Sequence, residues 1–233
     1  MIINADDYGL NRTKSRNIIL SFDEKVIDRC TCIVNTDFSD ECINFLPEKY
    51  KGKVGLHISL ISGHPLSEKM MNCTQLVKDG TFKNKNIRYF WFRLHLRKKV
   101  KEAVVDEINK QIDCFLNYGF ILKHFDSHGN VHLYPCLYKI FANILAERGF
   151  VSCRGTTINE RNFVKRLLHK KINNYYSKKI SRLERYSDPF RKITNDELLE
   201  IMVHPEIKEE KIYERDSNIL LSSIALKKSE AKK

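Results

Sequence analysis

Three short segments, far apart in the chain, carry acidic and histidine side chains at spacings that could build one metal site. The first holds the adjacent pair Asp6 and Asp7, the second holds His57, and the third holds His128 and His132. Each segment follows a short apolar run and precedes sequence typical of a turn or helix. Since α/β proteins carry their chemistry at the carboxyl ends of strands, we expect the three segments to meet there.

The residue types at these positions match the needs of a divalent metal. Carboxylate and imidazole together suit zinc, manganese, iron, cobalt or nickel, and with water also magnesium. Successive side chains on a strand diverge, so one of Asp6 and Asp7 can bind the metal while the other stays free to accept a proton. Each feature alone has a simpler explanation, because an Asp-Asp pair is common in turns and a lone His57 in an apolar strand is usually a core residue.

Three further residues could support this site. Asp126 lies two residues before His128 and could orient a ligand histidine. His204 ends a strand before Pro205, which suits a general acid that titrates near neutrality. Arg154 also ends a strand and could pair with Asp6 or hold substrate, although a surface arginine is an equally good interpretation.

Strands alternate with helices along the chain, which predicts parallel β/α units in an open sheet or a barrel. The expected strands are residues 2–4, 26–35, 53–61, 121–125, 151–154 and 198–203. The expected helices are residues 11–23, 39–46, 97–118, 135–148 and from about 217 towards the tail. We expect one domain over residues 1–233, with a basic helical insert at about 161–186.

Composition narrows the class of protein. The chain has 233 residues, of which 42% are hydrophobic, enough for a packed core. No stretch approaches the roughly 20 apolar residues that span a bilayer, and the first residues lack the basic region of a signal peptide. Seven scattered cysteines without a Cys-x-x-Cys pair favour free thiols in a reducing cytoplasm, so we expect a cytoplasmic protein.

The formal net charge of +12 is concentrated in residues 83–101 and 161–186. Basic residues interleaved with aromatic ones could mark a surface for nucleic acid or another anionic polymer. A solvated, lysine-rich helical face is the simpler interpretation in the absence of a recognised binding motif. We therefore do not expect a nucleic-acid partner.

In its ordered set of motifs the chain resembles the YdjC-like carbohydrate deacetylases, the family that includes chitooligosaccharide deacetylase. The matching motifs are residues 4–9, 55–57, 124–132 and 200–205. The resemblance implies a (β/α) barrel of the glycoside hydrolase/deacetylase type. It also implies removal of N-acetyl groups from amino-sugar-containing oligosaccharides or polysaccharides, with one divalent metal ion, magnesium or zinc. A homodimer is implied as well.

Roles for individual residues follow from this resemblance. The metal ligands would be Asp7, His57 and His128. Asp6 would be the general base that acts on metal-bound water, and His204 would be the general acid. The residues expected behind the ligands or at the substrate are Asp126, His132 and Arg154.

The chain departs from the family pattern at several places. Gly129 and Asn130 stand where members often carry further histidines, and Glu206 follows Pro205 where a glycine is usual. No last strand is evident beyond residue 221, which allows a distorted or incompletely closed barrel. Two alternatives stay open: another metal-dependent hydrolase on the same scaffold, such as an esterase or phosphodiesterase, or a basic polymer-binding protein.

Overall fold

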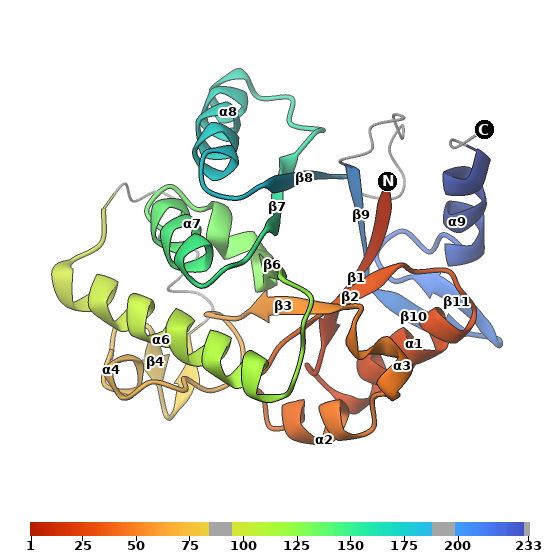
Figure 1. Ribbon diagram of the computed structural model, residues 1–233, viewed down its shortest axis with the longest axis horizontal. Helices are drawn as coiled ribbons and strands as arrows, with labels where there is room; N and C mark the ends of the chain where they lie inside the picture. Colours follow the sequence, from red (N-terminus) through yellow and green to blue (C-terminus); the bar gives the residue numbers. More distant parts are fainter. Residues whose placement is uncertain (84–94, 188–198, 231–233) are drawn as a thin grey trace.

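A closed barrel of parallel strands forms the centre of the computed structural model, which describes residues 1–83, 95–187 and 199–230 (Figure 1). The barrel strands in spatial order are β1 (Ile2–Tyr8), β2 (Arg29–Cys32), β3 (Val54–Ile58), β6 (His124–Ser127), β7 (Ser152–Thr157), β8 (Arg182–Ser187) and β9 (Leu199–Val203). The α/β barrel expected from the sequence is therefore confirmed. The allowance for incomplete closure is wrong, because β9 pairs with β1 from Ile2 opposite Glu200 to Ala5 opposite Val203.

Helices and two small hairpins surround the barrel (Figure 1). The helices are α1 (Arg12–Asp23), α2 (Ser39–Asn44), α3 (Glu48–Lys51), α4 (Glu68–Met71), α6 (Lys98–Asn117), α7 (Tyr138–Glu147), α8 (Phe163–Ser177) and α9 (Leu221–Glu230). The hairpins are β4 (Val77–Lys78) with β5 (Thr81–Phe82), and β10 (Pro205–Lys208) with β11 (Lys211–Glu214). Within the described residues, none of the helices is both long enough and apolar enough to cross a membrane.

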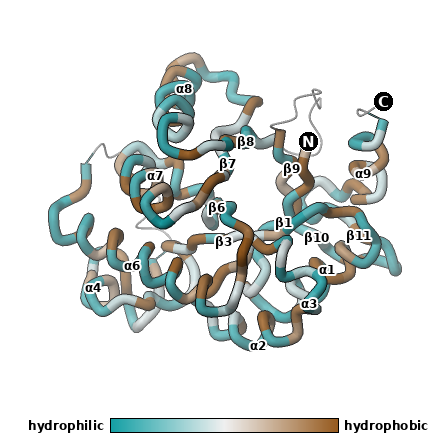
Figure 2. The backbone as a smooth tube through the Cα atoms, in the orientation of Figure 1, coloured by the Kyte–Doolittle hydropathy of each residue, from teal (hydrophilic) through white to brown (hydrophobic). Residues whose placement is uncertain are grey.

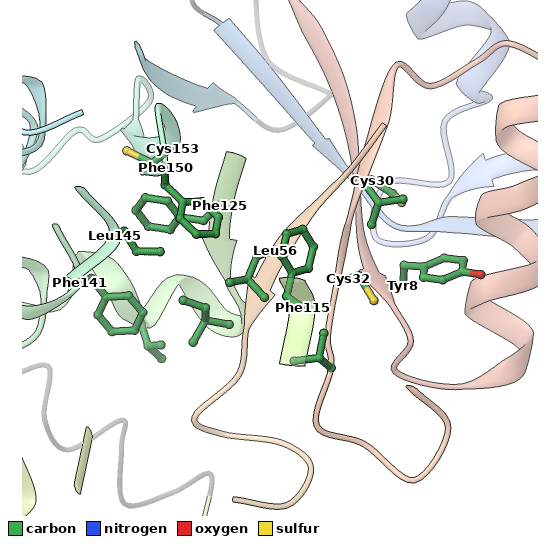
Figure 3. Close-up of a cluster of buried hydrophobic side chains, with 14 of the residues drawn as sticks. Tyr8, Cys30, Cys32, Leu56, Phe115, Phe125, Phe141, Leu145, Phe150 and Cys153 are labelled. Atoms are coloured by element: carbon green, nitrogen blue, oxygen red, sulfur yellow. The ribbon is translucent and has the colours of Figure 1, made fainter. Parts of the chain in front are cut away.

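Strand residues alternate between two very different environments. Apolar side chains point outwards from the barrel to the surrounding helices, as Leu56 and Phe125 do, and fill the main hydrophobic core. Figure 3 shows Phe125 and Phe150 beside Phe141 and Leu145, the last two from α7. The intervening side chains are polar or charged and bond to one another inside the barrel. The period of two thus separates an apolar outer layer from a polar interior.

Local sequence explains where the helices next to the site begin and end. The Asn11 side chain accepts a hydrogen bond from the backbone N–H of Lys14 and caps α1. α6 buries an apolar stripe and stops before Gly119, whose φ of 80° lies in the left-handed region. These two ends fix the helices that follow β1 and precede β6.

The basic segment 161–186 is not an insert. It consists of α8 and most of β8, a barrel strand between β7 and β9. The charged sequence of β8 concealed the strand, because Glu184 points into the polar interior and pairs with Arg29. Of the second basic concentration, residues 83–101, residues 84–94 lie outside the described residues, while Arg97, Lys98, Lys99 and Lys101 lie at the start of α6.

The aromatic cluster of Phe125, Phe150 and Tyr176 should contribute strongly to the free energy of unfolding. Phe125 is fully buried, with ring centroids 6.0 Å from Phe150 and 6.1 Å from Tyr176. We expect Phe125→Ala to lower the free energy of unfolding by about 3 to 5 kcal/mol, measured by urea denaturation. Phe163→Ala, on the exposed face of α8, is the matched control and should change it by less than about 0.5 kcal/mol. Equal effects of the two substitutions would contradict this core assignment.

Candidate metal-binding active site

Asp7 lies near the end of β1 in a left-handed backbone conformation, with φ of 72°. This conformation is costly for a residue with a Cβ and is concentrated at functional sites. The strand register with β2 shifts between Ala5 and Tyr8, so Asp6 and Asp7 leave β1 in different directions. Asp7 thereby reaches residues on β3 and after β6. The sequence predicted a turn from Asp6 onwards, whereas β1 continues to Tyr8.

Two histidines approach the same oxygen of Asp7. Its Oδ1 lies 2.8 Å from Nδ1 of His128 and 3.4 Å from Nε2 of His57. His57 comes from β3, and His128 opens the 3-10 helix His128–Leu133 directly after β6. Gly129 and Asn130 then adopt φ of 65° and 53° and reverse the chain. The structure therefore brings together the three residues that were expected to hold a metal.

The atoms of this cluster lack the partners that buried polar atoms normally have. Asp7 Oδ1 and His57 Nε2 are buried without a hydrogen bond. One ligand atom from each of Asp7, His57 and His128 lies within 4.8 Å of the others. Orphaned donors and acceptors of this kind call for a further ligand. One carboxylate oxygen and two imidazole nitrogens fit a divalent metal.

Asp126 orients His57 from the barrel interior. Its Oδ1 lies 2.5 Å from His57 Nδ1, and its Oδ2 accepts a hydrogen bond from the Thr31 hydroxyl and forms an ion pair with Arg154. Burial disfavours the charged imidazole, but Asp126, Asp7 and Asp6 outweigh burial and raise the pKa of His57 to about 10. The surrounding carboxylates thus favour positive charge at this position, whether a proton or a metal cation brings it.

Asp6 is held by Arg154 beside this cluster. Its Oδ1 accepts from Arg154 Nη2 at 2.5 Å and from Asn4 at 2.8 Å, and its Oδ2 accepts from Arg154 Nη1 at 2.8 Å. Arg154 is fully buried and also binds Asp126 at 2.7 Å and Glu200 at 2.5 Å. Of the interpretations offered by the sequence, the surface arginine is wrong because no part of Arg154 reaches solvent.

His132 is not part of the Asp7–His57–His128 cluster. Its Nδ1 is 2.6 Å from the Ser127 hydroxyl, and its Nε2 is 2.9 Å from the carbonyl oxygen of Arg154. Burial lowers the pKa of His132 to about 4, so the ring is neutral near pH 7. Its two hydrogen bonds fix the turn after β6 and the strand that carries Arg154.

A pocket of about 220 Å³ opens beside Asp6 and His204. His204 follows β9, and its Nδ1 faces two carboxylates, with Glu214 at 3.6 Å and Asp216 at 3.5 Å. Lys14 and Arg215 also line this pocket. The Nζ of Lys14 also lies 2.7 Å from Asp7 Oδ2, so Lys14 connects the pocket to the Asp7–His57–His128 cluster.

Sequence reasoning missed several residues of this site. Lys14 was hidden among other basic residues, and Glu214 lies in a hairpin that was not predicted. Glu200 bridges Arg154 and Arg29, its Oε2 lying 2.7 Å from Arg29 Nη2. The available signal was a single charged residue in a strand with no other charge, as with Arg29 in residues 29–32 and Glu200 in residues 199–203. That pattern indicates a charged barrel interior.

Comparison with known proteins identifies one family and several relatives of this chain. The family model described as YdjC-like protein matches residues 1–231. A carbohydrate deacetylase of Clostridium beijerinckii is 25% identical over 93% of this chain and 85% of its own length, and one of Vibrio parahaemolyticus is 28% identical over 88% and 77%. A chitooligosaccharide deacetylase of Salmonella typhimurium is 28% identical over 64% and 56%.

A solved structure shares the fold. It belongs to a candidate cellobiose-phosphate cleavage protein of Enterococcus faecalis V583, with a TM-score of 0.65, 22% identity, and coverage of 89% of this chain and 81% of that one. The likeness supports the barrel architecture.

Removing Arg154 should be costly because three buried carboxylates share it. We expect Arg154→Met to lower the free energy of unfolding by about 3 to 5 kcal/mol, measured by urea denaturation. Arg12→Met is the matched control, since Arg12 and Glu41 form an exposed pair, and its effect should stay below about 1 kcal/mol. A loss below about 1 kcal/mol for Arg154→Met would refute the central role of this guanidinium.

Glu214 should make stability depend on pH. Burial opposes its ionisation, but the nearby His204 and the hydrogen bonds from Ser217 outweigh burial and lower its pKa from 4.5 to about 2. Its stabilising contribution is therefore present above pH 4.5 and is lost as pH falls towards 2. At pH 6 we expect the free energy of unfolding of the wild type to exceed that of Glu214→Gln by about 1 to 2 kcal/mol. This figure allows for solvent screening, because Glu214 lies beside the pocket.

This difference should shrink steadily in urea titrations at pH 5, 4 and 3. Glu48→Gln is the control, since Glu48 is exposed and pairs only with Lys51 among the described residues, and it should show no such trend. A difference for Glu214→Gln that is constant with pH would rule out ionisation of Glu214 as its source.

Proposed function

This chain belongs to the YdjC-like protein family, and from that premise we propose that it is a metal-dependent carbohydrate deacetylase. The proposed reaction removes N-acetyl groups from amino-sugar-containing oligosaccharides or polysaccharides. The observation that carries the proposal is the position of Asp6, a carboxylate fixed by Arg154 between the Asp7–His57–His128 cluster and the pocket. Relatives named carbohydrate deacetylase and chitooligosaccharide deacetylase support the substrate class.

Asp7, His57 and His128 would hold one divalent cation, magnesium or zinc. The orphaned Asp7 Oδ1 and His57 Nε2, with the carboxylates around them, support this assignment. When bound, such a cation polarises a carbonyl group and makes water a stronger acid. Asp126 would keep His57 in the orientation that presents Nε2 to the cation.

Asp6 would be the general base. Its bonds to Arg154 and Asn4 hold the carboxylate at the edge of the pocket. Oδ1 accepts from both Arg154 and Asn4, whereas Oδ2 accepts only from Arg154 and retains a lone pair for another proton donor. Asp6 would take a proton from the water that attacks the acetyl carbon. Arg154 acts here only through Asp6, because it is itself enclosed.

His204 would be the general acid. Glu214 and Asp216 face its Nδ1, so Nε2 is the ring nitrogen that would donate a proton to substrate. When the C–N bond breaks, His204 would protonate the departing sugar nitrogen. The oxygen of the attacking water would stay on the acetyl carbon and give acetate. The proton from His204 would complete the free amine, and the proton held by Asp6 would restore His204 or pass to solvent.

The pocket is small and would enclose only part of an oligosaccharide. Its volume of about 220 Å³ is below the about 300 to 1,000 Å³ typical of sites that enclose a small molecule. It would enclose the reacting sugar unit and leave the rest of the saccharide outside. The expectations of one domain, a homodimer and a cytoplasmic location stay predictions.

The test is product analysis with N-acetylated chitooligosaccharides. We expect acetate and free amine in equal amounts, and Asp6→Asn should lower kcat by on the order of 10²- to 10⁴-fold because the base is lost. Asp113→Asn, at a surface carboxylate of α6 that binds Arg148, is the matched control and should keep wild-type activity. Full activity of Asp6→Asn would exclude it as the base, and release of acetate from O-acetyl esters alone would favour an esterase.

Metal binding is measured separately by isothermal titration of chelator-treated protein. We expect one equivalent of a divalent cation per chain, and His57→Ala should weaken binding at least about tenfold. His64→Ala, a partly exposed histidine paired with Asp37, should leave the affinity unchanged. Unaltered binding in His57→Ala would refute the assigned ligand set.

A further inference from the structure

The outward face of α8 exposes large apolar side chains in its first half. Phe163, Val164 and Leu167 are 63%, 72% and 53% exposed. Their spacing places them on one side of the helix, within about one helical turn. The opposite side of α8 is anchored by Ile172 and Tyr176, both fully buried. The apolar side chains are therefore not required for packing α8 onto the barrel.

Unpaired positive charge surrounds this apolar group. The sequence from Arg161 to Ser181 contains no acidic residue. Its basic residues are Arg161, Lys165, Arg166, Lys170, Lys171, Lys178 and Lys179. None of them forms an ion pair with any residue in the described part of the chain, whereas other cations such as Arg148 and Lys49 do.

A shallow concavity of about 440 Å³ lies between α7 and α8. Lys139, Lys170, Lys171 and Lys178 line it together with Tyr138 and Tyr175. The two tyrosine rings meet edge to face at 5.4 Å, and the Tyr175 hydroxyl is 3.1 Å from the Asn143 side-chain oxygen. Leu167 borders the same concavity. Four ammonium groups on a fixed aromatic floor suit a phosphate-bearing anion.

We propose that this face of α8 docks on an anionic lipid bilayer, with lipid phosphate groups in the lysine concavity. Figure 1 shows α8 at the periphery of the molecule, beside α7, and Figure 2 shows hydrophobic residues alternating with hydrophilic ones along this helix. Apolar side chains that enter the headgroup boundary next to lysines that meet anionic lipids are the two components of peripheral membrane binding.

Charge complementarity and apolar exposure together select this partner over others. A nucleic acid would neutralise the lysines but leave Phe163, Val164 and Leu167 in water. An apolar protein surface would cover those three side chains and leave the lysines unpaired. The bilayer interface satisfies both groups at once. The proposal is independent of the reaction proposed above, since it uses no residue of that site.

The test is co-sedimentation of the full chain with phosphatidylcholine vesicles that contain or lack phosphatidylserine. We expect at least about tenfold tighter binding to the anionic vesicles, with affinity falling as salt rises. The double substitution Lys170→Glu with Lys171→Glu should weaken binding at least about tenfold. Lys101→Glu with Lys110→Glu, at exposed positions of α6, is the control of equal charge and should retain most of the binding.

The apolar contribution is tested with Phe163→Ser and Leu167→Ser together. This variant should keep the wild-type urea midpoint and still lose at least about tenfold in vesicle affinity. Equal binding to both vesicle types, or equal losses in the α6 control and the α8 variants, would overturn the proposal. Tight binding of single-stranded RNA without vesicle binding would also overturn it and assign the face to nucleic acid.

Discussion

The guanidinium of Arg154 is fully buried inside the barrel and contacts the carboxylates of Asp6, Asp126 and Glu200. These three residues come from β1, β6 and β9, so one side chain ties together strands that are distant in sequence. A buried arginine without carboxylates, or carboxylates without the arginine, would be strongly unfavourable. The arrangement of the site and the closure of the barrel therefore depend on the same set of charges.

This dependence explains why the barrel interior is polar. Inward positions hold residues such as Arg29, His57 and Glu184, while outward positions hold the apolar side chains that pack against the helices. The hydrophobic driving force thus comes from the outer layer, and the inner layer determines which charge lies next to which. Because the interior pairs are satisfied by one another, Asp6 and His57 have fixed orientations before any ligand arrives. Such preorganisation is what a hydrolytic site requires.

Much of the fold followed from local sequence, while the expected ligand set followed from the ordered motifs that resemble the family. Short apolar runs around Leu56 and Phe125 indicated strands, and His204 was recognisable because Pro205 restricts its backbone. The rest depended on long-range pairing that no local pattern contains. β8 was missed because Glu184 looks like a surface residue until Arg29 is placed opposite it. The positive φ of Asp7 is equally invisible, since it arises from the shift in register against β2.

Lys14 has a consequence for how the site fills. Its ammonium group neutralises Asp7 and at the same time forms part of the pocket wall. A cation bound at Asp7 Oδ1 would repel this ammonium group on Oδ2 of the same carboxylate, and would so weaken the hold of Asp7 on Lys14 and favour its interaction with what lies in the pocket. By thermodynamic reciprocity, an occupant that attracts Lys14 must strengthen cation binding by the same factor. One flexible side chain in the first turn of α1 thus makes the two binding equilibria cooperative.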